Sequence, residues 1–273
     1  MTDLTPIDQT SDNVIQARPV QIHFPPPRRR VSPMELSTVS RRDAVLDLGL
    51  VLLVTLLLPF GLNFIALLLM EPPAFEGSLT YLEALGKWSD ALLVGGLLAY
   101  LLLRHRLPPT SFGLHLRRPH IQGLWALGSL VCTYGWLLLS LVGILSIIVV
   151  YPPLEEDIMQ RSKVLEAMPT ENLGLTVLLL IPVAIHEEIL FRALLLPYLR
   201  RLCGNWTVAI LLSCGVFAVL HLDQGWLGVL QVMGIGTVFA VFFVLSRSLM
   251  AVIVAHFLFN LMQFQLIRLL PDW

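Results

Sequence analysis

The amino-acid sequence predicts an all-α membrane protein, a polytopic bundle of seven to eight transmembrane helices. Two compositional observations support this prediction: 56% of the 273 residues are hydrophobic, and only 14% are charged. Soluble globular domains contain roughly 45–50% apolar and 25% charged residues, so a soluble enzyme is not expected. The third observation is a series of long apolar runs, because about 20 such residues are needed to cross a hydrocarbon layer of about 30 Å as a helix.

A polar segment precedes the first apolar run. Three prolines followed directly by three arginines occupy residues 25–30. A cleavable signal peptide would place an apolar core within about the first 15–30 residues, and this segment has none. We therefore expect residues 1–43 to be a disordered cytoplasmic tail.

Residues 44–119 are expected to hold the N-terminal transmembrane helices. The first run covers residues 44–70 and is interrupted near its start by Asp47. An acidic stretch separates it from the second run, which is clearly apolar over about residues 91–103. We expect this second span to begin earlier, near Leu82. Each run is apolar enough to be interpreted as one span.

The second half of the chain, residues 120–270, is expected to form a single membrane domain. Its first run, residues 121–150, would be about 45 Å long as a helix at about 1.5 Å per residue. That length exceeds one upright span, so we expect a tilted helix or an interfacial end, or an eighth span if the run is divided. A charged segment within residues 155–171 is expected to form a short surface helix outside the core.

Four further apolar runs complete the bundle: residues 173–191, 206–222, 226–245 and 249–270. The first of these continues at lower hydrophobicity until Arg200 and Arg201 end it. We expect the break at residues 222–226 to be buried, because irregular backbone at membrane depth is tolerated where it lines a cavity within the protein.

The distribution of basic residues predicts the orientation of the chain. Arginine clusters alternate along the sequence with loops that are acidic or neutral; the clusters fall at residues 28–30, 41–42, 104–118, 200–201 and 247. Loops rich in Lys and Arg remain on the cytoplasmic side, so we expect a multi-pass protein of the cell membrane with a cytoplasmic N-terminus.

Composition also bears on the partners of the protein. The lipid bilayer is an expected partner, and nucleic acid is not, since no stripe of basic residues appears outside the short clusters beside the runs. The three cysteines show no CxxC pairing, which favours neither a disulfide framework nor a thiolate zinc site.

The candidate functional residues are the ionisable side chains inside the apolar runs. A charge near the bilayer centre costs at least about 2.5–3.5 kcal/mol, so such residues mark functional sites by default. Three runs carry them at i, i+4 spacing, which places each pair on one helix face: Glu188 with Arg192, Phe217 with His221, and His256 with Asn260. Glu187 lies about 100° around the helix from Glu188, so Arg192 can neutralise only Glu188 well. Glu187 is therefore the freer of the two carboxylates.

These residue types allow three kinds of chemistry. The zinc motif HExxH is absent, because Leu190 occupies the position of its second histidine. A metal could still be held by glutamate and histidine side chains from different helices. The same set could instead hold a water, with a glutamate as base and His and Asn as oxyanion donors. A third interpretation is an ion or proton path through a transporter or channel.

The three motifs together resemble those of a known family. Glu187-Glu188-x-x-x-Arg192, Phe217-x-x-x-His221 and His256-x-x-x-Asn260 look like the signature motifs of CPBP intramembrane proteases. That family includes CAAX prenyl endopeptidases and bacteriocin-processing, Abi-like enzymes. The resemblance covers roughly residues 120–267, and the segment after His221 is also similar to the one that follows the family's middle histidine.

The resemblance implies an all-helical membrane fold and hydrolysis of a peptide bond in a peptide or protein substrate, within or at the edge of the bilayer. It implies that Glu187 is the general base on water, oriented by Glu188 and Arg192. His221 and His256 would bind the water, the oxyanion or a metal, and Asn260 would complete the oxyanion site. A divalent metal such as zinc would take Glu187, His221 and His256 as its ligands, which would make the protein a metalloprotease. Hydrolysis with a metal and hydrolysis without one both stay open at this point. A family member that serves as a non-catalytic membrane scaffold is a further alternative.

Overall fold

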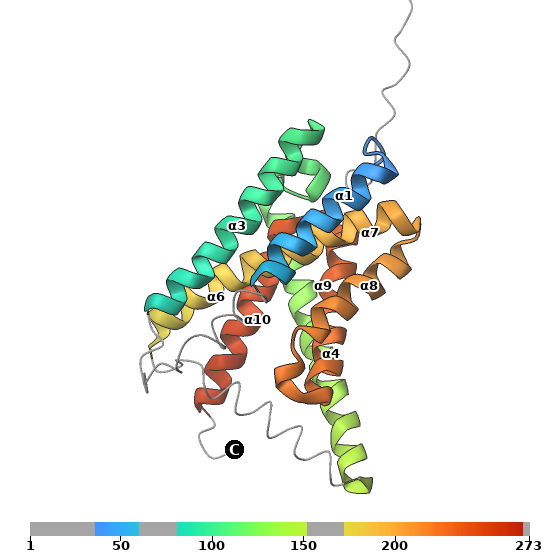
Figure 1. Ribbon diagram of the computed structural model, residues 1–273. Coiled ribbons are helices and arrows are strands. Elements are labelled where there is room, and N and C mark those ends of the chain that lie inside the picture. The colour runs from blue at the N-terminus through green and yellow to red at the C-terminus, as the bar shows by residue number, and fades with distance from the viewer. Residues whose placement is uncertain (1–35, 60–80, 152–171, 270–273) are drawn as a thin grey trace, which may run out of the picture. The chain divides into compact units, whose positions relative to one another are not determined.

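The computed structural model describes residues 36–59, 81–151 and 172–269 (Figure 1). All of these residues belong to one compact unit, Ser32–Trp273. Most of the expected N-terminal tail and the whole expected surface helix within residues 155–171 lie outside the described residues.

Helices are the only regular secondary structure in the part of the chain that is described. The first half contains α1 (Arg41–Leu52), the π-helix η1 (Leu53–Leu57), α3 (Tyr81–His105), the 3-10 helix η2 (Pro109–Phe112) and α4 (Pro119–Val150). The second half contains α6 (Leu173–Glu188), the π-helix η4 (Ile189–Leu195), α7 (Leu196–Cys203), α8 (Trp206–Val219), the 3-10 helix η5 (Leu222–Gln224), α9 (Gly225–Ser246) and α10 (Leu249–Leu269).

The all-helical membrane class expected from the sequence is confirmed. Five helical segments within the described ranges are long and apolar enough to cross a membrane: Ala84–His105, Pro119–Ile147, Leu173–Cys203, Leu222–Ser246 and Leu249–Leu266. Several such helices in one chain make this a multi-pass membrane protein.

The expected count of seven to eight spans is not confirmed. The first apolar run is described only as far as residue 59, and the fifth run forms α8, whose 14 residues are short for a span. The third run is one uninterrupted helix, α4, so no additional span arises from dividing it. Its 32 residues leave tilt or an interfacial end as the way to fit the bilayer.

Side-chain caps define where several helices begin. Ser40 caps α1, and its hydroxyl accepts a hydrogen bond from the backbone N–H of Asp43 at 3.0 Å. Asn172 and Asn205 cap α6 and α8 in the same way. Such caps satisfy backbone donors that have no partner inside the helix, and each contributes about 1 kcal/mol.

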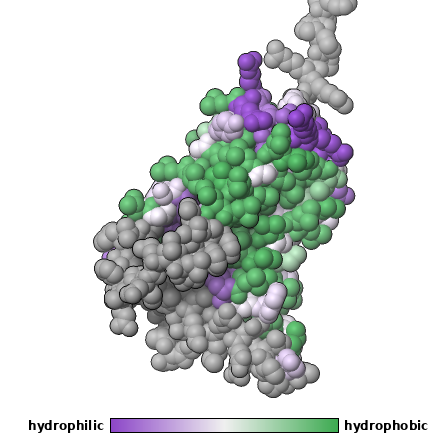
Figure 2. All heavy atoms as spheres, in the orientation of Figure 1, coloured by the Kyte–Doolittle hydropathy of each residue, from purple (hydrophilic) through white to green (hydrophobic). Residues whose placement is uncertain are grey.

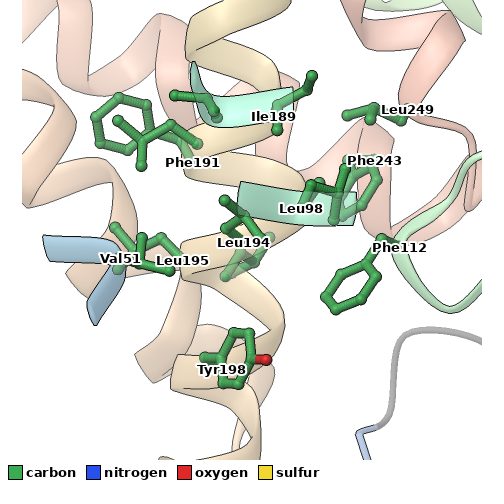
Figure 3. Close-up of a cluster of buried hydrophobic side chains, with 14 of the residues drawn as sticks. Val51, Leu98, Phe112, Ile189, Phe191, Leu194, Leu195, Tyr198, Phe243 and Leu249 are labelled. Carbon is green, nitrogen blue, oxygen red and sulfur yellow. The ribbon is translucent and has the colours of Figure 1, made fainter. Parts of the chain in front are cut away.

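The apolar core gathers around η4, whose seven residues are all buried. Figure 3 shows Leu98 of α3 beside Leu194 and Val51 of α1 beside Leu195. Around this centre α6 packs on α3 and α10, α8 packs on α9 and α7, and α4 packs on α9 and α10. A π-helix closes i→i+5 hydrogen bonds in place of the i→i+4 bonds of an α-helix and is frequent at functional sites, which draws attention to the residues on either side of it.

Apolar side chains also cover much of the surface. Figure 2 shows a broad hydrophobic flank beneath a hydrophilic end. Among the most exposed large apolar residues are Leu92 at 73%, Leu103 at 79% and Leu124 at 68%. Exposed apolar area on this scale is unusual for a soluble monomer and suits contact with lipid chains.

Asp47, which interrupts the first apolar run, is the centre of a buried polar cluster. Only 1% of the residue is exposed, and its Oδ2 lies 2.5 Å from Nε2 of His105. The hydroxyl of Tyr198 donates to the same oxygen at 3.1 Å, and Nε of Arg104 lies 3.5 Å from Oδ1. The cluster therefore joins α1, the end of α3 and α7.

Candidate active site

Glu188 and Arg192 form a buried ion pair at the junction of α6 and η4. Their side chains are 0% and 1% exposed, and Nη1 of Arg192 lies 3.1 Å from Oε1 of Glu188. Nη2 of Arg192 donates to the backbone oxygen of Gly236 in α9 at 3.1 Å. The guanidinium also lies over the rings of Phe217 and Phe239, at 5.0 and 5.6 Å. Arg192 is thus fixed by neighbours from two other helices as well as by its ion-pair partner.

The same carboxylate holds His256 of α10. Nδ1 of His256 lies 2.7 Å from Oε1 of Glu188, and the imidazole stacks on Phe239 with centroids 5.1 Å apart. The Glu188 carboxylate, which pairs with Arg192, accepts this hydrogen bond, so Nδ1 carries its proton. The other ring nitrogen, Nε2, then faces Oε2 of Glu187 at 3.7 Å.

The two adjacent glutamates therefore have different surroundings. The Glu188 side chain is fully enclosed, and its Oε2 has no hydrogen-bond partner within the described structure. Glu187 has a side chain that is 19% exposed. The prediction that Glu187 is the freer carboxylate agrees with this difference.

His221 stands just beyond the end of α8. Its Nδ1 lies 2.8 Å from the backbone oxygen of Phe217, and the two rings are in contact with centroids 4.7 Å apart. A carbonyl oxygen can only accept a hydrogen bond, so Nδ1 is protonated in the neutral ring and Nε2 carries the free lone pair. Phe217 therefore positions His221 through its backbone as well as its ring.

The expectation that the break at residues 222–226 is buried was wrong. Leu222 is 43% exposed and Trp226 is 70% exposed, and only Gly225 of the five is buried. Burial is unnecessary because the turn supplies its own partners: the N–H of His221 donates to the Ala218 oxygen, and that of Gln224 to the His221 oxygen.

Four of the six predicted site residues line one cavity of about 160 Å³ between α6, the end of α8 with the break after it, α9 and α10. They are Glu187, His221, His256 and Asn260. Such a volume holds several waters, for each of which about 10–15 Å³ is enough. The remaining lining residues are Leu180, Val183, Phe217, Gln224, Val232, Ile235, Phe259, Gln263 and Phe264. The other two predicted residues, Glu188 and Arg192, do not line the cavity and lie behind it.

Two polar lining residues were not predicted from the sequence. Gln263 lies three positions after Asn260 on α10, a spacing that places both on one helix face. Gln224 follows His221 within the short break. A search for neutral amides beside the motifs, in addition to ionisable residues, would have found both. His186 does not line the cavity; it lies near Lys87 and Asp90 of α3.

The metal-ligand set named from the sequence, Glu187, His221 and His256, stays a prediction. No group of three or more His, Cys, Asp and Glu side chains in the described ranges is close enough together to hold a metal ion. His256 uses one ring nitrogen for Glu188, and its other nitrogen is 3.7 Å from Glu187. Glu187, His221 and His256 therefore share a cavity without forming a three-ligand set.

The fold and the site define a multi-pass helical membrane protein with a cavity lined by glutamate, histidine and asparagine. Comparison with protein families gives a match over residues 169–262 to the family described as type II CAAX prenyl endopeptidase Rce1-like. This segment contains all three motifs, and the match supports membership of the CPBP family of intramembrane proteases. No curated protein and no solved structure matches the chain.

Proposed function

We propose that this protein is an intramembrane endopeptidase that hydrolyses a peptide bond with a water activated by Glu187. One observation carries the proposal: Glu187 of α6, His221 after α8, and His256 and Asn260 of α10 line a single cavity. The family match supports a protease acting on a peptide or protein in a membrane.

The nucleophile in this proposal is a water held between α6 and α8. The Glu187 carboxylate accepts a hydrogen bond from one O–H of this water, and the free Nε2 lone pair of His221 accepts a hydrogen bond from the other. The water oxygen then attacks the carbonyl carbon of the scissile bond, forming a tetrahedral intermediate while the first proton passes to Glu187.

The oxyanion of that intermediate needs hydrogen-bond donors. His256, when protonated, has an Nε2–H on the cavity side, and the Asn260 amide supplies a second donor from the next turn of α10. The Glu188 carboxylate stabilises the imidazolium through Nδ1. When the intermediate collapses, the C–N bond breaks, Glu187 gives its proton to the leaving amine, and a carboxylic acid is released.

Glu188 and Arg192 are positioning residues in this scheme. Arg192 pairs with Glu188, and Glu188 fixes the tautomer and orientation of His256. Outer hydrogen-bond partners of this kind typically contribute 10–100-fold to the activity of a site. No step in this scheme requires a metal.

The test is cleavage of a peptide that ends in a prenylated CAAX motif, the substrate class in the family description. The full chain in proteoliposomes is compared with Glu187→Gln and with Asp223→Asn, an equivalent change at an exposed residue outside the cavity. We expect cleavage by the wild type and Asp223→Asn, and at least a 100-fold loss in Glu187→Gln.

Two outcomes would contradict the proposal. Substantial cleavage by Glu187→Gln would remove Glu187 as the base. Intact peptides together with an ion flux that responds to Glu187→Gln would favour the alternative of a transporter or ion-conducting protein, which also uses buried Glu and His.

A further inference from the structure

A second cavity, of about 210 Å³, lies between the start of α1 and the end of α7, two helices that run side by side in Figure 1. It is lined by Leu36, Ser37, Arg41, Arg200, Arg201 and Gly204. Half of these residues are arginines, and none is acidic. Ser37, Arg41 and Gly204 are exposed, so the cavity is accessible from outside.

Two of the guanidinium groups are held in place by backbone oxygens. Nη2 of Arg41 donates to Leu202 at 3.0 Å, and Nε of Arg201 donates to Val39 at 2.8 Å. These bonds join α7 to Val39 and Arg41 at the start of α1, so they fix both side chains at the cavity. A guanidinium has five N–H donors, and each bond uses only one of them.

The third arginine has an unused buried donor. The guanidinium of Arg200 lies over the ring of Trp206, 5.4 Å from its centroid, and its Nε is buried without a hydrogen-bond partner. Within the described residues, none of the three arginines forms an ion pair with a carboxylate. Three cations with spare donors at one cavity favour an anion with several acceptor oxygens.

The position of the cavity indicates the source of that anion. Figure 2 shows hydrophilic side chains gathered at one end of the apolar flank, the level at which a lipid head group meets a membrane protein. Arginine recognises phosphate through paired N–H donors, and basic pockets between transmembrane helices bind anionic head groups. We propose that Arg41, Arg200 and Arg201 bind the phosphate of an anionic phospholipid.

This site is separate from the protease chemistry. Its lining residues and those of the active-site cavity have no member in common. The proposal therefore stands or falls independently of the proposed function.

The test is lipid binding to the full chain, purified in detergent and titrated with phosphatidylglycerol, with diacylglycerol, which has no phosphate, and with inorganic phosphate. Binding is followed by native mass spectrometry. Ser37→Asp adds a negative charge to the lining without removing an arginine, and Ser37→Asn is its uncharged control of the same shape. Arg200→Gln removes the guanidinium with the unused donor.

We expect phosphatidylglycerol to bind the wild type and Ser37→Asn equally, and diacylglycerol to bind much more weakly. Ser37→Asp should lower the affinity about fivefold, the factor for one charge near a membrane surface, and Arg200→Gln by a similar factor. Inorganic phosphate could also displace the lipid and bind more weakly to both variants. That result would support the phosphate site, with free phosphate rather than a lipid head group as the ligand. Lipid and phosphate binding that neither variant changes would overturn the proposal.

Discussion

Nδ1 of His256 lies 2.7 Å from Oε1 of Glu188, although 68 positions separate the two residues in the chain. This contact joins α10 to the junction of α6 and η4, directly behind the cavity. It gives the two adjacent glutamates different roles, because Glu188 is occupied by His256 and Arg192 while Glu187 faces the cavity.

The first prediction concerns this positioning contact. Glu188→Gln keeps the shape of the side chain but removes the charge that orients and stabilises the His256 imidazolium. We expect kcat for peptide cleavage to fall about 10–100-fold with little change in KM, since Glu188 does not line the cavity. An equal rise in KM with unchanged kcat would show instead that Glu188 acts on substrate binding.

The second prediction concerns the close approach of α9 to Arg192. A Cβ added at Gly236 would lie 2.9 Å from the Phe217 ring and 3.5 Å from Nη2 of Arg192. We expect Gly236→Ala to reduce cleavage about tenfold and to lower the free energy of unfolding by about 1–3 kcal/mol. Gly135→Ala is the control, because a Cβ there meets nothing within 4 Å. Equal behaviour of the two variants would contradict the prediction.

The third prediction tests the packing of α4 on α9. A Cβ at Gly234 would lie 1.9 Å from the ring of Trp136, whose Nε1 donates to the Gln231 oxygen at 3.0 Å. Gly234→Ala should therefore displace the indole and lower the melting temperature in detergent, at a cost of about 1–3 kcal/mol. Gly215→Ala in α8 has open space and should be neutral or stabilising by up to about 1 kcal/mol. A Gly234→Ala protein as stable as the wild type would show that these helices adjust freely.

The fourth prediction concerns the Asp47 cluster. Asp47→Asn leaves His105, Tyr198 and Arg104 without the carboxylate that joins them, so we expect a loss of stability of about 1–3 kcal/mol. Asp43→Asn is the matched control, because the Asp43 side chain is 42% exposed and its ion pair with Arg104 is long, at 3.9 Å. The control should change the melting temperature little. Similar losses in both variants would argue against a special role for the buried acid.

The fifth prediction concerns metal dependence. Because Glu187, His221 and His256 do not form a three-ligand set, we expect cleavage to continue in the presence of EDTA and of phenanthroline. Added zinc should not increase the rate. Loss of activity with chelator and its recovery with zinc would contradict this prediction and would restore these three residues as candidate ligands.

Several features followed from the sequence alone, because they depend on local pattern. Apolar runs and their charged ends identified the membrane class and located most helices, since the cost of exposing polar backbone to lipid leaves few alternatives. The i, i+4 spacing within each motif placed His256 and Asn260 on one face, as their common cavity confirms. The family resemblance needed only the three motifs in order, and the match at residues 169–262 agrees with it.

Other features depended on contacts between distant segments. Sequence spacing shows which residues share a helix face but not which neighbouring helix they meet, so it could not show that Glu188 binds His256 of α10 as well as Arg192. Nor could it show that Asp47 pairs with His105 and Tyr198 rather than merely interrupting a span. These pairings are decided by how the helices pack, because a buried polar group is stable only where tertiary structure brings it a partner.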